Sequence, residues 1–140
     1  MNVDTVADVY QRLNKNTLDS LKQIYHPDVV FEDAAHQLNG WQALSDYFEQ
    51  LYRNVAACRF DIQSTHQAGE VGFIIWIMRL RHPKLKGGKE VAVRGISHIE
   101  FFEGKIIHHR DYFDMGEMLY EQLPVLGSLI KAIKKRLGQS

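Results

Sequence analysis

The residues from 104 to 114, Gly-Lys-Ile-Ile-His-His-Arg-Asp-Tyr-Phe-Asp, concentrate side chains that can exchange protons. The stretch is typical of a β-strand, in which successive side chains point to opposite faces. His109, Asp111 and Phe113 therefore share one face, which we expect to point inward. The opposite face is predicted to lie at a subunit interface and carries the other three members, His108, Arg110 and Tyr112.

Asp33 is a second aspartate that ends an apolar strand stripe, because Val29, Phe31 and Asp33 alternate onto one face. Two carboxylates that share an interior site can divide acid and base work between them. We therefore predict Asp111 and Asp33 to be catalytic. The alternative makes Asp33 a turn-capping residue and Asp111 a salt-bridge partner of an arginine or histidine, because structural ion pairs also place carboxylates inside proteins.

His109 lies two residues from Asp111, so it can orient the carboxylate or share its proton. The alternative is a core histidine that is satisfied by Ser97 or by a backbone carbonyl. The His-x-Asp spacing also matches part of a two-histidine, one-carboxylate iron site, but no histidine follows Asp111. We predict no metal, and the lack of a Gly-rich phosphate loop predicts no organic cofactor.

Three amphipathic helices are predicted before the long strands, over residues 3–15, 17–25 and 40–54. Pro27 is expected to stop the second helix. A short strand over 29–33 lies between the second and third helices. A tail follows the strands and is predicted to be helical on both sides of Pro124, with a basic outer face on its second part, 125–137.

Four strands are predicted over residues 58–67, 71–81, 90–102 and 104–114, where the hydrophobic period is two. The run from Phe73 to Met78 is apolar on both faces, so a partner subunit is expected to cover its outer side. This order of elements predicts an α+β domain, with three N-terminal helices packed on a strongly curved mixed, mostly antiparallel sheet and a C-terminal helical tail.

The hairpin at Glu103-Gly104 decides which residues of the preceding strand lie beside His109 and Asp111. A three-residue loop with a bulge would pair Ser97 with His109 and Gly95 with Asp111, with odd positions facing inward. A two-residue turn would instead place Ile96 and His98 beside Asp111 and His109. We expect the three-residue loop.

Composition limits the function classes. The chain has 140 residues and 17 basic against 17 acidic residues, so its overall charge predicts neither nucleic acid nor stable membrane association. It is expected to form a single domain, 1–140, with a core over about 3–123 and an amphipathic tail over 124–140. The single Cys58, the absence of a secretory signal and the lack of an apolar run of about 20 residues predict a cytoplasmic protein.

Three motifs together resemble the nuclear transport factor 2-like superfamily, and most closely its SnoaL-like branch, which also includes limonene-epoxide hydrolase and ketosteroid isomerase. The motifs are Phe31-Glu-Asp33 at the end of a strand, Gly40-Trp41 at the start of a helix, and Glu103-Gly-Lys-Ile followed by Arg110-Asp-Tyr-Phe-Asp114. The resemblance covers about residues 3–123. It implies a cone-shaped domain with an internal pocket and a homodimer formed through the outer sheet face.

The resemblance also assigns roles to individual positions. Asp111 matches a catalytic aspartate of the hydrolase, whose second aspartate and arginine would lie where this chain has Ile75, Trp76, Ile77 and Met78. Asp33 matches the general base of the isomerase. The isomerase's oxyanion tyrosine would fall near Val9, next to Tyr10, and its protonated aspartate near Ser97.

The sequence thus predicts a SnoaL-like enzyme of isomerase, cyclase or hydrolase type, acting on a small, largely apolar or polycyclic ligand. The alternative is a non-catalytic ligand-binding or dimerisation module of the same fold. Besides the catalytic candidates Asp111, Asp33 and His109, we predict ten pocket-lining residues: Tyr10, Phe31, Trp41, Phe48, Tyr52, Trp76, Met78, Gly95, Ser97 and Phe113.

Overall fold

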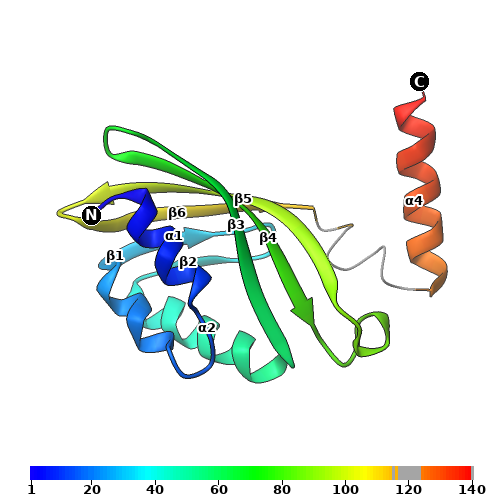
Figure 1. The fold of residues 1–140 in the computed structure, drawn as a ribbon, viewed down its shortest axis with the longest axis horizontal. Coiled ribbons are helices and arrows are strands. Elements are labelled where there is room, and N and C mark those ends of the chain that lie inside the picture. Colours follow the sequence, from blue (N-terminus) through cyan, green and yellow to red (C-terminus); the bar gives the residue numbers. More distant parts are fainter. Residues whose placement is uncertain (115, 117–123, 140) are drawn as a thin grey trace.

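The computed structural model describes residues 1–114, 116 and 124–139. Its elements are, in chain order, α1 (Val3–Gln11), η1 (Leu18–Gln23), β1 (Tyr25–Glu32), β2 (Gln37–Asn39), α2 (Trp41–Asn54), β3 (Ala57–Ala68), β4 (Val71–Arg81), η2 (Lys86–Gly88), β5 (Val91–Phe102), β6 (Lys105–Phe113) and α4 (Pro124–Gly138). Figure 1 shows the long strands bending over α1, η1 and α2, which all lie on one side of the sheet.

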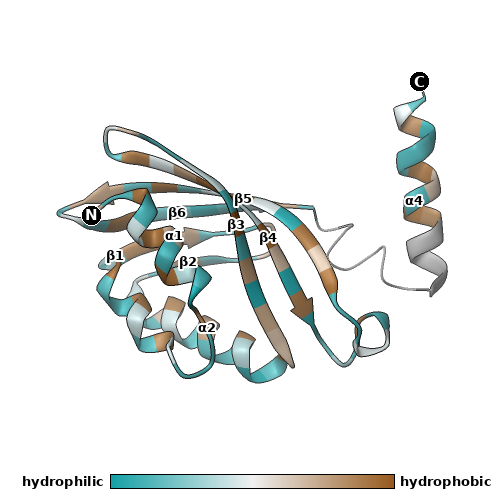
Figure 2. Ribbon diagram, viewed as in Figure 1, coloured by the Kyte–Doolittle hydropathy of each residue, from teal (hydrophilic) through white to brown (hydrophobic). Residues whose placement is uncertain are grey.

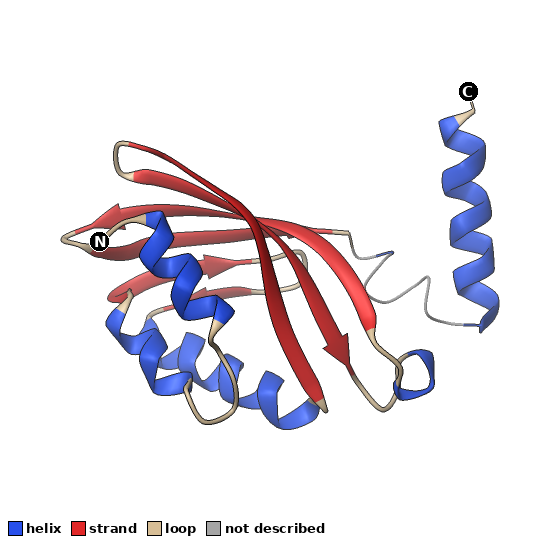
Figure 3. Ribbon diagram, in the orientation of Figure 1, coloured by secondary structure: helices blue, strands red, loops and turns tan. Residues whose placement is uncertain are grey.

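The six strands form one sheet in the order β2-β1-β6-β5-β4-β3. β1 and β6 run parallel and every other neighbouring pair is antiparallel, so the expected mixed, mostly antiparallel sheet and the α+β class are confirmed (Figure 3). Because β6 lies between β1 and β5, the strand that carries His109 and Asp111 occupies the middle of the sheet. Asp33 and Asp111 thereby come from the ends of adjacent strands.

The prediction of three N-terminal helices needs a correction. Residues 1–56 form two α-helices, α1 and α2, with a 3-10 helix between them, and Tyr25 begins β1 instead of ending a helix. Pro27 does not stop a helix; it lies within β1, where the ladder to β6 is irregular between Tyr25 and Val30. Proline has no N–H to donate, so an interruption of the ladder is where a strand accommodates it.

Both expected registers of the β5–β6 hairpin are wrong. The turn has two residues, Glu103 and Gly104, whose φ angles of 52° and 75° are those of a type I′ turn. An irregularity between Glu100 and Phe101 then shifts the pairing by one residue, so Ser97 stands opposite Asp111. This β-bulge restores the inward parity, and the predicted inner face of β5 is confirmed by the burial of Val91, Val93, Gly95, Ser97, Ile99 and Phe101.

The core lies between the helices and the inner face of the sheet, and α1 packs on β3 and β4 while α2 packs on β1. Apolar residues also lie on the outer face, where Phe73, Ile96 and Tyr112 are exposed. Figure 2 shows hydrophobic and hydrophilic residues alternating along the long strands, as the period of two requires. The outer face therefore carries apolar side chains that the described residues leave uncovered.

The tail helix α4 stands apart from the sheet and the other helices (Figure 1). Its Lys134 Nζ lies 3.0 Å from Asp114 Oδ2, just beyond the end of β6. Leu129, Ile133 and Leu137 recur along it and are exposed. The predicted helix before Pro124 falls outside the described residues. Over residues 1–114, 116 and 124–139, no helix is long and apolar enough to cross a bilayer.

Candidate functional site

A cavity of about 410 Å³ lies under the curved sheet and is walled mainly by apolar side chains. Asp111 and Asp33 both line it, so the sheet brings the two predicted carboxylates to one space. Six of the ten residues predicted to line a pocket also border it, and these are Tyr10, Phe31, Phe48, Trp76, Met78 and Phe113. The volume suits a small organic molecule.

The other four predicted lining residues lie elsewhere. Trp41 stacks on the ring of Tyr25, 5.8 Å away between centroids, and does not belong to the cavity lining. Tyr52 borders a separate surface hollow beside Cys58. Gly95 is covered by the indole of Trp76, since a Cβ on Gly95 would come within 2.2 Å of that ring. Ser97 lies behind Asp111 and touches its carboxylate.

The carboxylate of Asp111 is held from behind by two side chains. Ser97 Oγ donates a hydrogen bond to Oδ1 at 2.5 Å, and His109 Nε2 donates to the same oxygen at 2.6 Å. Trp76 Nε1 in turn donates to Ser97 Oγ at 2.9 Å, so the single hydroxyl proton of Ser97 is directed to Asp111. Among the described residues, Oδ2 has no hydrogen-bond partner. One carboxylate oxygen is therefore held by two side chains, and the other makes no such contact among the described residues.

A line of buried groups continues from His109 away from Asp111. Tyr25 Oη is 2.8 Å from His109 Nδ1, and Tyr10 Oη is hydrogen-bonded to Tyr25 Oη. Because the proton of a neutral His109 ring is used at Nε2, Nδ1 accepts from Tyr25, which then accepts from Tyr10. Burial raises the pKa of both tyrosines well above the usual range, so they act as neutral donors.

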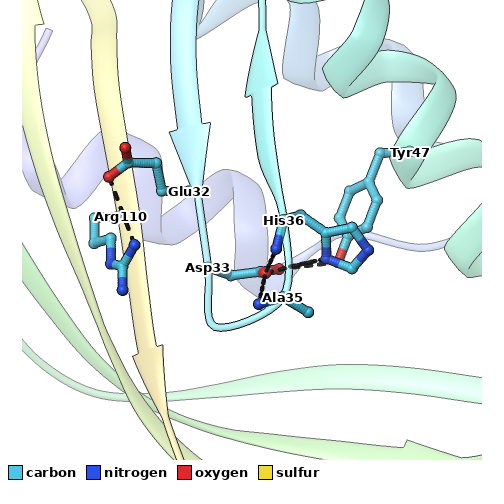
Figure 4. Close-up of polar contacts among 6 residues, drawn as sticks. All are labelled: Glu32, Asp33, Ala35, His36, Tyr47 and Arg110. Carbon is cyan, nitrogen blue, oxygen red and sulfur yellow. Dashed lines mark hydrogen bonds and ion pairs between the residues drawn. The ribbon is translucent and has the colours of Figure 1, made fainter.

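Asp33 is arranged differently, at the turn between β1 and β2. Its Oδ1 accepts from the backbone N–H groups of Ala35 at 2.8 Å and His36 at 2.7 Å, and from His36 Nδ1 at 3.1 Å. Tyr47 Oη donates to Oδ2 from α2 at 3.3 Å. Figure 4 shows these donors gathered around one carboxylate. The contacts fit the turn-capping interpretation of Asp33.

The side chains that sequence reasoning missed at the cavity or its supporting network include His36, Tyr47, His82 and Tyr25. The signal for His36 was present in the Asp-x-x-His spacing, because a turn that aspartate caps brings the side chain three residues later back over it. Tyr25 carried no such signal, since it was assigned to a helix.

The opposite face of β6 is a separate site. Arg110 Nη1 lies 3.6 Å from Glu32 Oε2 on the neighbouring strand, and His108 Nε2 lies 3.5 Å from the same oxygen. Figure 4 shows Arg110 and Glu32 beside β6, away from the carboxylate of Asp33. Arg110 therefore neutralises Glu32, not Asp111. Over the described part of the chain, no three His, Cys, Asp or Glu side chains are grouped as a metal site would need.

A family model described as SnoaL-like domain matches residues 6–109. The chain belongs to the SnoaL-like domain family. The match runs from α1 through His109, so it takes in Asp33 and the strand that leads to Asp111, and it ends before α4. No protein with a curated description matches the chain.

Solved structures show the same fold. An NTF2-like protein of unknown function from Burkholderia pseudomallei is 17% identical with a TM-score of 0.74, covering 85% of this chain and 96% of that one. An LEH-like epoxide hydrolase from Mycobacterium tuberculosis is 19% identical, with a TM-score of 0.72 and coverages of 93% and 95%. A putative SnoaL-like polyketide cyclase from Shewanella putrefaciens is 21% identical, with a TM-score of 0.68 and coverages of 82% and 91%. The SnoaL-like protein thus has an NTF2-like α+β fold that is shared by proteins of different activities.

Proposed function

We propose that this SnoaL-like protein is an enzyme that moves a proton on a small, largely apolar molecule, with Asp111 as the acid/base. The observation that carries the proposal is the Asp111 carboxylate itself. It lines an apolar cavity, its Oδ1 is fixed by Ser97 and His109, and its Oδ2 has no partner among the described residues. A carboxylate held in this way is positioned for proton transfer to a bound molecule.

The step begins with a substrate whose acidic C–H bond lies next to a carbonyl group. Asp111 Oδ2 takes the proton, so the C–H bond breaks, an O–H bond forms, and the electron pair moves onto the carbonyl oxygen as an enolate. Return of the proton to the same or another carbon completes an isomerisation. Attack of the enolate on a second carbonyl of the substrate forms a carbon–carbon bond, and the oxygen of that carbonyl takes the proton back from Asp111 to complete a cyclisation. His109 and Ser97 keep Oδ1 in place throughout. No cofactor is required for either outcome.

The alternative function is a ligand-binding module of the same fold without chemistry. The observation that favours it is the strand Val71–Arg81, where the resemblance to the epoxide hydrolase calls for an aspartate and an arginine. The inner-face positions there are occupied by Ile74, Trp76 and Met78. Epoxide opening by that arrangement therefore has no support in this chain.

The test of the enzyme proposal is deuterium exchange at the carbon next to the carbonyl of 1-tetralone, an apolar bicyclic ketone, followed by NMR in heavy water. The wild-type protein should accelerate the exchange, and Asp111→Asn should lower that acceleration by about a hundredfold, because it removes the proton acceptor while keeping its size. Asp61→Asn is the matched control on the surface. Tight binding of 1-tetralone with no exchange would establish the binding module instead, and equal exchange by wild type and Asp111→Asn would remove Asp111 from the role.

We also propose that two copies associate through the outer sheet face, which the exposed Phe73, Ile96 and Tyr112 support. Sedimentation at micromolar concentration should give a dimer, and a monomer would contradict it. The cytoplasm is the proposed compartment. Cys58 is the single cysteine of the chain, so the chain forms no internal disulfide that an oxidising compartment would stabilise.

A further inference from the structure

We propose that His36 is a second catalytic base of the cavity, which takes a substrate proton through Nε2, and that Asp33 positions it. The inference rests on the proposed function, since it adds a second proton acceptor to the site of Asp111. His36 lines the same cavity as Asp111. Its side chain is 46% exposed, so the ring can reach both a ligand and solvent.

The contacts of Nδ1 decide which nitrogen of His36 is available. Nδ1 lies 3.1 Å from Asp33 Oδ1 and 3.3 Å from Oδ2. A carboxylate only accepts hydrogen bonds, so the ring proton is at Nδ1 and the lone pair is at Nε2. Figure 4 shows the ring of His36 with Nδ1 turned to Asp33 and the other nitrogen on the far edge. Nε2 therefore presents a base.

Another histidine of the same cavity, His82, has a different partner at Nδ1. His82 also lines the cavity, but its Nδ1 accepts the backbone N–H of Lys84 at 3.0 Å. The neutral ring of His82 thus carries its proton at Nε2 and presents a donor. The two histidines offer opposite hydrogen-bonding groups, and only the one with a carboxylate behind it is set to accept a proton.

Asp33 is suited to position His36 and is not suited to act alone. Its Oδ1 already accepts two backbone N–H groups, and Tyr47 donates to Oδ2. The Tyr47 and His36 rings lie 4.9 Å apart between centroids, which fixes the other side of the imidazole. When Nε2 takes a proton, the negative charge of Asp33 balances the imidazolium that forms.

The proton step at His36 balances without another reactant. The bond between hydrogen and a substrate oxygen or acidic carbon breaks, the N–H bond forms on the Nε2 lone pair, and the electron pair stays with the substrate. The exposed ring then releases the proton to solvent. A cavity with one acceptor at Asp111 and another at His36 fits an enolisable carbonyl compound that also carries a hydroxyl group.

The test uses 5-nitrobenzisoxazole, an apolar probe of general bases. A base takes the proton from its ring carbon, the C–H electron pair forms a nitrile as the N–O bond breaks, and the coloured phenolate is released. His36→Ala should lower the rate about tenfold, and added imidazole should restore most of it by replacing the missing ring. His66→Ala, the matched control at an exposed histidine outside the cavity lining, should stay within about twofold of wild type. His36→Gln repeats the measurement if the alanine variant does not fold.

A rate in His36→Ala and His36→Gln equal to wild type, or no recovery with imidazole, would overturn the inference. Asp111→Asn is measured in parallel so that the two assignments can fail separately. A loss of rate in Asp111→Asn alone keeps Asp111 as the acid/base and excludes His36 as a base. A loss of rate in the His36 variants alone keeps His36 as a base and excludes Asp111 from the acid/base role.

The positioning role of Asp33 has its own readout. Nitrogen-15 NMR of the neutral rings should place the proton of His36 at Nδ1 and that of His82 at Nε2. Asp33→Asn keeps an oxygen that can accept from Ala35 and His36, so the turn is retained, but it should lower kcat for the probe with little change in KM. A His36 proton found at Nε2 in the wild type would contradict the assignment.

Discussion

Two histidine–aspartate pairs border one cavity in opposite order. In the strand pair, His109 and Asp111, the imidazole is buried at 1% exposure and the carboxylate faces the cavity at 19%. In the turn pair, Asp33 and His36, the carboxylate is the buried member at 5% and the imidazole is exposed at 46%. The same two residue types thus present an acceptor oxygen at one site and an acceptor nitrogen at the other.

The difference comes from what binds each carboxylate. Asp111 lies two residues after His109 on a strand, so both side chains point inward and side chains alone hold Oδ1. Asp33 ends a strand at a turn, so backbone N–H groups occupy its Oδ1 and leave the histidine on the outside. Local backbone geometry therefore decides which member of a histidine–aspartate pair can meet a ligand.

Ser97→Ala should have the largest effect on the strand pair. The change removes the hydroxyl that donates to Asp111. It also leaves the buried Trp76 Nε1 without its hydrogen-bond acceptor. We expect the free energy of unfolding to fall by about 2 kcal/mol in urea titrations, and exchange of 1-tetralone to fall with it. Ser64→Ala on β3, where the half-buried hydroxyl lies 3.3 Å from Nε2 of the exposed His66, is the control and should change the free energy of unfolding by less than about 0.5 kcal/mol. Equal effects of the two serine variants would show that the Ser97 contact contributes nothing.

The stability of the two histidine–aspartate pairs can be compared by removing the tyrosine hydroxyl that hydrogen-bonds to each pair. Tyr25→Phe leaves both Tyr10 Oη and His109 Nδ1 without a buried partner, and should cost about 1.5 kcal/mol of unfolding free energy. Tyr47→Phe removes a single 3.3 Å contact beside an exposed ring and should cost about 0.5 kcal/mol. Thermal and urea unfolding of the two variants measure the difference. A larger loss in Tyr47→Phe would reverse our view of which pair is rigid.

Much of the sheet followed from the sequence because its hydrophobic period is unambiguous. The strand Val71–Arg81 was predicted with its observed bounds, and the odd positions of β5 face inward as expected. The register of the β5–β6 hairpin could not be predicted, since it depends on a bulge near Phe101 that no turn residue announces. The placement of Asp111 survived because that bulge shifts the pairing without turning Ser97 and Asp111 to opposite faces.

The strand pair was accessible to parity reasoning, whereas the turn pair was not. Asp33 was correctly placed on an inward face, but its partners come from a turn and from α2, which alternation along a strand does not describe. Gly95 shows the same limit, because its apparent place in a pocket wall is filled by the indole of Trp76. Contacts between side chains of distant elements depend on packing, which a single sequence does not state.

High pH gives the smallest effect and reaches both pairs through their tyrosines. Burial raises the pKa of Tyr25 and Tyr10 beside the strand pair and of Tyr47 beside the turn pair, and nearby Asp33 adds to the rise at Tyr47. In the unfolded chain a tyrosine loses its proton near pH of about 10. Between that pH and the higher folded pKa the native state binds more protons than the unfolded state, so stability is fully present below about pH 10 and is lost as the pH rises. Tyr25→Phe should flatten this alkaline decline of the free energy of unfolding in urea titrations, because one of the tyrosines responsible is gone.

Phenolate absorbance gives a second measurement. The folded wild type should match folded Tyr25→Phe up to about pH 11. An extra ionising tyrosine in the wild type would show that the Tyr25 hydroxyl is accessible to solvent beside the strand pair.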